Sequence, residues 1–66
     1  MDNEKILLQR TGSVALIAWQ SSNEDDVEFI TTIAYGDDGT WDWGSYFGNN
    51  LQRAFDDYKK KVEKRA

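Results

Sequence analysis

The sequence has no cysteine, no histidine and no proline among its 66 residues. Without cysteine or histidine, neither disulfides nor a structural zinc site can stabilise so short a chain, so stability must come from packing or from a partner. No stretch approaches the roughly 18 apolar residues of a membrane span, and the amino terminus lacks a basic region followed by an apolar run. We therefore expect one domain over residues 1–66, located in the cytoplasm, with no metal or other cofactor.

Aromatic residues are what the chain has in quantity. It contains three Trp, three Tyr and three Phe. Each such side chain can bury a large apolar area, which offsets the poor surface-to-volume ratio of a small domain. This aromatic content also argues against disorder.

The net charge of −4 conceals two regions of opposite sign. Residues 1–57 hold 11 acids against three bases, a balance of −8, whereas residues 58–66 hold five bases against one acid, a balance of +4. An acidic body disfavours nucleic acid and favours a basic protein surface.

Four segments have the composition of β-strands: residues 5–10, 14–20, 27–35 and 40–47. A tight connection at Thr11-Gly12-Ser13 follows the first, and the Asp38-Gly39 pair predicts a hairpin turn between the third and fourth. Alternation in the fourth segment places Trp41 and Trp43 on one face, and Gly44 indicates a bulge or a close backbone approach.

The carboxy-terminal segment, residues 49–64, is predicted to form a helix. Asn49 and Gln52 have the spacing of a helix N-cap and its reciprocal partner. Apolar side chains then recur at helical spacing, at Leu51, Ala54, Phe55, Tyr58 and Val62. The bases of the tail complement the negative end of the helix dipole, so they need no ligand to explain them.

These elements predict an α+β fold of order ββββα, a four-stranded antiparallel meander with one amphipathic helix packed on one face. The other face has no predicted cover. Because the second strand is apolar on both faces, we expect an exposed apolar patch there that includes Trp19 or Leu16, and such patches tend to mark interfaces.

The tetrapeptide Tyr35-Gly36-Asp37-Asp38 resembles the YGDD turn of RNA-dependent polymerases, which holds catalytic divalent metals. Two-metal phosphoryl transfer needs a further carboxylate from a separate strand and a cleft for substrates, which 66 residues cannot build. The alternation of Asp38, Thr40 and Asp42 matches only the start of a calcium loop. A solvated acidic hairpin turn is the interpretation that fits both patterns.

Function is weighed by the surface that the fold leaves exposed. The leading hypothesis is a small non-enzymatic interaction module, an inhibitor or regulator of a basic partner that handles nucleic acid. The residues expected to bind that partner are Trp19, Glu24, Asp25, Asp26, Asp37, Asp38, Asp42 and Tyr46. Catalysis is not expected, since no pair of the remaining acid, base or nucleophile types has the spacing of a site.

Two alternatives stay open. Aromatic residues on an open sheet face could stack on the bases of a single-stranded nucleic acid in a dimeric binder, although the known neighbours of these rings in sequence are acidic. A homodimer could also close through the uncovered face or through an edge strand such as residues 5–10.

Overall fold

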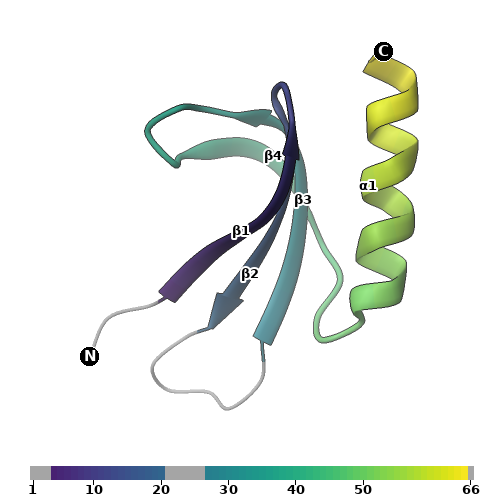
Figure 1. Cartoon of the computed structure of the whole chain (residues 1–66). Coiled ribbons are helices and arrows are strands. Elements are labelled where there is room, and N and C mark those ends of the chain that lie inside the picture. Colours follow the sequence, from purple (N-terminus) through teal and green to yellow (C-terminus); the bar gives the residue numbers. More distant parts are fainter. Residues whose placement is uncertain (1–3, 21–26, 66) are drawn as a thin grey trace.

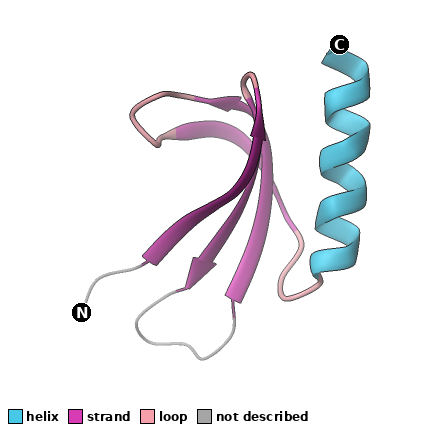
Figure 2. Cartoon of the chain, viewed as in Figure 1, coloured by secondary structure: helices cyan, strands magenta, loops and turns pink. Residues whose placement is uncertain are grey.

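The computed structural model describes residues 4–20 and 27–65. Its elements are β1 (Glu4–Thr11), β2 (Val14–Gln20), β3 (Val27–Tyr35), β4 (Trp41–Tyr46) and α1 (Leu51–Arg65). The four strands form one antiparallel sheet in the order β1-β2-β3-β4, and α1 packs against it (Figure 2). The predicted ββββα fold is confirmed. In the described residues, no helix combines the length and apolar content that a membrane span requires.

The main core lies between α1 and the two central strands. Ala54 and Tyr58 of α1 are buried against Val14 and Leu16 of β2. Phe29, Phe47, Phe55 and Val62 pack around these four side chains. The helix therefore covers β2 and β3, as the apolar stripe on α1 predicts, and Leu16 lies beneath it rather than in an exposed patch.

The sheet face away from α1 carries a second apolar cluster. Ala15, Ile17 and Ile30 are almost completely buried there, under partly buried aromatic side chains from β2, β3 and β4. The sheet bends away from α1, so that the β3–β4 loop lies on the side opposite to the helix (Figure 1). The expectation of an uncovered face is thus wrong in part, because the aromatic side chains Trp19, Tyr35 and Trp41 of the sheet itself cover the apolar residues on that face.

Strand β1 contains a register shift between Leu7 and Gln9. Leu8 is the extra residue, as in a β-bulge. Beyond this point Lys5 pairs with Trp19, and Leu7 pairs with Ile17. Since one extra residue exchanges the two faces of a strand, the bulge places Lys5 on the Trp19 side of the sheet.

The helix begins later than predicted. Asn50 is the N-cap, since its Oδ1 accepts a 3.1 Å hydrogen bond from the backbone N–H of Arg53. Gln52 donates instead to Asp56. The chain first completes a turn after β4, in which Gly48 adopts a positive φ of 59° and the N–H of Asn50 bonds the carbonyl of Phe47. This turn displaces the cap by one residue from Asn49.

Candidate functional site

The β3–β4 hairpin is closed by its own backbone and by Asp38. Gly36 N–H donates to the Thr40 carbonyl at 2.8 Å, and Gly39 takes a φ of 85°, which favours glycine. The Asp38 carboxylate accepts hydrogen bonds from both the hydroxyl and the backbone N–H of Thr40, at 2.7 and 3.1 Å. These bonds hold the pKa of Asp38 below its ordinary value, so the exposed turn keeps a negative charge.

Asp37, at the same turn, is connected to strand β1. Its carboxylate lies 2.8 Å from a guanidinium nitrogen of Arg10. Arg10 also donates to the Gly12 carbonyl, and its guanidinium carbon lies 5.2 Å from the centroid of the Tyr35 ring. The pair joins the hairpin to the β1–β2 turn, and it leaves one side of the carboxylate open because Asp37 is almost fully exposed.

Strand β4 presents two aromatic side chains to solvent. Trp43 is 77% exposed and Tyr46 is 56% exposed. Trp43 also has a φ of 53°, the left-handed region that a bulky residue rarely adopts. Asp42 precedes it and is exposed, while the Asp42 carbonyl accepts a hydrogen bond from Thr32.

Trp41 and Trp43 were predicted to share one face of the sheet. The positive φ of Trp43 separates their side chains. Trp41 stacks on Tyr35, with ring centroids 6.5 Å apart, and packs on the cluster opposite α1. Gly44 makes room for it: a Cβ there would lie 3.1 Å from Ile30 Cγ2 and 3.2 Å from Trp41 Nε1. The predicted close backbone approach at Gly44 is confirmed.

Trp19 lies on the face opposite α1, as one of the two residues expected there, and it is half-buried rather than fully exposed. The ammonium group of Lys5 lies over two rings, 5.6 Å from the Trp19 centroid and 5.3 Å from the Trp41 centroid. The indole Nε1 of Trp19 is buried and has no hydrogen-bond partner in the described part of the chain. Trp19 therefore contributes to packing.

The structure thus brings together three of the predicted acids and one predicted ring on one hairpin. We call this set, with Trp43 added, the hairpin surface; it consists of Asp37, Asp38, Asp42, Trp43 and Tyr46. Glu24, Asp25 and Asp26 lie outside the described residues. Sequence reasoning missed Trp43, because strict alternation assigns it to the face of Trp41; the adjacent Gly44 was the available signal that alternation fails there.

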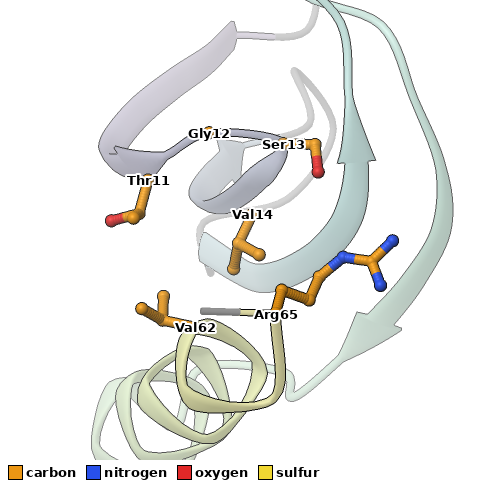
Figure 3. Close-up of a pocket in the computed structure, with 6 residues that line it drawn as sticks. All are labelled: Thr11, Gly12, Ser13, Val14, Val62 and Arg65. Atoms are coloured by element: carbon orange, nitrogen blue, oxygen red, sulfur yellow. The ribbon is translucent and has the colours of Figure 1, made fainter.

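A surface pocket lies between the β1–β2 turn and the last turn of α1 (Figure 3). Val14 and Val62 face the same space, and the Arg65 guanidinium points away from Val62 (Figure 3). The residues that line this pocket do not form a convergent set of acid, base or nucleophile groups. Within residues 4–20 and 27–65, no group of three or more acidic side chains is placed to hold a metal ion.

Comparison of the chain with protein families, with curated proteins and with solved structures found no match. Functional inference therefore depends on the geometry of the hairpin surface and of the rings on the face opposite α1.

Proposed function

We propose that this chain is a non-enzymatic interaction module that binds a basic protein surface through the hairpin surface. The observation that carries the proposal is Trp43, a large side chain that is 77% exposed and held at a positive φ beside Asp42. A left-handed conformation costs a non-glycine residue about 1 to 2 kcal/mol. Strain of this kind tends to be kept where a side chain must be presented for function.

The chemistry of the hairpin surface fits a partner rich in Arg and Lys. Trp and Tyr are the residues most enriched at the energetic centres of protein interfaces, and a Trp ring attracts Arg and Lys through its π face. The carboxylates of Asp37, Asp38 and Asp42 add negative charge to the same hairpin. Such charge accelerates encounter with a basic partner and disfavours acidic ones.

Proteins that handle nucleic acids carry basic surfaces of this kind, so an inhibitor or regulator of such a protein is the role that we infer. The acidic balance of residues 1–57 extends the same attraction beyond the hairpin. A cytoplasmic location remains part of this proposal.

The proposal is tested by affinity capture with the intact chain as bait, followed by binding measurements with the purified partner. We expect Trp43→Ala, and separately the triple change of Asp37, Asp38 and Asp42 to Ala, to weaken binding at least about tenfold. Glu63→Ala, an exposed acid on α1, is the matched control and should bind like the unchanged chain. The proposal is refuted if Trp43→Ala and the triple Asp variant both bind the partner as tightly as the unchanged chain.

A second function, binding of single-stranded nucleic acid, is favoured by one observation. Lys5 lies over the rings of Trp19 and Trp41, and Arg10 lies over the ring of Tyr35. Positively charged side chains therefore accompany aromatic rings on the face opposite α1. This is the combination that single-strand binders use. However, Arg10 is already paired with Asp37, whereas Lys5 forms no ion pair with the residues that the structure describes.

Titration with an oligothymidylate at low salt distinguishes the two functions. Nucleic-acid binding predicts quenching of tryptophan fluorescence that weakens as salt rises and that Lys5→Gln reduces. No quenching at low salt would remove this alternative and leave the protein-binding proposal in place.

A further inference from the structure

A second group of exposed apolar side chains lies on β1 and at the start of α1. Ile6 is 54% exposed, Leu8 is 45% exposed and Leu51 is 46% exposed. Together with Leu7, they are four of the six large hydrophobic residues classed as exposed in the described residues. The other two are the rings of the hairpin surface.

A groove runs beside Leu8 and Leu51, between β1 and α1. The helix packs mainly on β2 and β3, and it reaches β1 through a 2.7 Å hydrogen bond between the hydroxyls of Tyr58 and Thr11. Its first part is lined by Leu8, Gln9, Leu16, Leu51, Gln52 and Phe55. It continues toward the end of the helix past Tyr58 and Val62, with Lys59 and Glu63 at its rim. We call this groove, together with Ile6, the β1 surface.

The β1 surface is electrically neutral, in contrast to the rest of the molecule. Its side chains carry one positive charge, at Lys59, and one negative charge, at Glu63. Lys5 and Arg10, the two bases of β1, are instead directed to the aromatic rings on the opposite face. A chain of net charge −4 repels its own copies, so self-association is least opposed where the contacting surface is neutral.

The two sheet edges are not equivalent. At β4, the positive φ of Trp43 interrupts the extended backbone. Strand β1 is two residues longer, and apolar side chains lie at its centre. Contact of β1 with β1 also closes after two copies, because the same patch serves both partners about a two-fold axis. An apolar edge that is open in the isolated chain is a place where such pairing occurs in sheet proteins.

We propose that two copies of this chain associate through the β1 surface, with Ile6, Leu8 and Leu51 of each copy packing against the groove of the other. The dimer leaves Trp43 and Tyr46 of each copy free, because β4 forms the sheet edge opposite to β1. It would therefore display two partner-binding sites, and the proposal stands whether or not the hairpin surface binds a basic protein.

Sedimentation equilibrium of the purified chain across a wide concentration range tests this assembly. We expect the mass to rise from one chain to two, and we expect Leu8→Lys and Leu51→Lys each to raise the dissociation constant at least about tenfold, by placing a charge in the contact. Tyr46→Lys, which changes an exposed apolar side chain at the other sheet edge, is the control and should dimerise normally. Circular dichroism identifies any variant that has unfolded.

Three results would overturn the proposal. The first is a mass of one chain at every concentration. The second is a dimer that both lysine variants at Leu8 and Leu51, if folded, leave intact. The third is a dimer that Tyr46→Lys dissociates while the two β1-surface variants do not.

Discussion

The hydroxyl of Thr31 donates a 2.6 Å hydrogen bond to the carboxylate of Asp57, across the interface between β3 and α1. Thr31 is completely buried, so its hydroxyl depends on this partner. Lys61 forms an ion pair with the same carboxylate and lies 3.3 Å from the hydroxyl of Ser45 on β4. Asp57 and Lys61 together thus connect α1 to β3 and β4 and help to fix the position of the helix on the sheet.

The pH dependence of stability should reflect this carboxylate. Burial opposes ionisation of Asp57, but hydrogen bonds from Lys61 and Thr31 outweigh it and hold the pKa below the ordinary value of 3.8. Because the pKa is lower in the folded chain than in the unfolded one, the ionised carboxylate stabilises the fold above about pH 4. This contribution declines as the pH falls through the folded-state pKa.

We therefore expect Asp57→Asn to lower the free energy of unfolding at neutral pH by about 1 to 2 kcal/mol. In urea unfolding at several pH values, the difference from the unchanged chain should shrink below about pH 4. Asp56→Asn is the control: Asp56 is half-exposed and pairs with Lys59 on the same helix, so its loss should cost less than about 0.5 kcal/mol. An equal loss in the two variants would contradict the role given to Asp57.

The helix cap gives a second prediction. Asn50 satisfies the backbone N–H of Arg53, whereas no capping bond to Asn49 is found in the described residues. Asn50→Ala should lower the free energy of unfolding by about 1 kcal/mol, and Asn49→Ala should leave it nearly unchanged. Thermal unfolding of the two variants side by side measures the difference. A larger loss of stability in Asn49→Ala than in Asn50→Ala would indicate that Asn49 is the N-cap, as the sequence predicted.

The fold could be predicted from the sequence because its signals are local. The Asp38-Gly39 turn, the apolar runs of β2 and β3 and the helical spacing of Ala54 and Tyr58 each specify one element, and short connections leave few topologies. These elements were located to within one or two residues.

The site was predictable only in part, because two irregular backbone positions decide it. The bulge at Leu8 brings Lys5 onto Trp19, and neither composition nor periodicity places a bulge. The positive φ of Trp43 turns that ring outward, where regular alternation would have buried it with Trp41. Asp57, one of a charged pair on an apparently polar helix face, contacts Thr31, because α1 lies over β3 as well as β2.

Gly44 gives a third prediction, which tests the cover of the face opposite α1. A methyl group at this position would lie within 3.2 Å of both Ile30 and Trp41, closer than ordinary van der Waals contact. We expect Gly44→Ala to lower the free energy of unfolding by about 1 to 3 kcal/mol through overpacking, measured by urea unfolding. Combination with Trp41→Phe should recover part of this loss, since a smaller ring vacates the space. A Gly44→Ala variant as stable as the unchanged chain would show that this contact is not tightly packed.

The conformation of Trp43 predicts opposite effects on stability and on binding. Asn adopts the left-handed region more readily than Trp, and little burial is lost because Trp43 is largely exposed. Trp43→Asn should therefore raise the free energy of unfolding by up to about 1 kcal/mol. Trp41→Asn should instead lower it by roughly 2 to 3 kcal/mol, since the Trp41 ring packs against Tyr35 and covers Ile30. If Trp43 is kept for recognition, Trp43→Asn should at the same time weaken partner binding at least about tenfold in the purified system. A variant that is less stable than the unchanged chain would mean that the Trp43 ring supports the fold, and the functional argument drawn from its strain would fail.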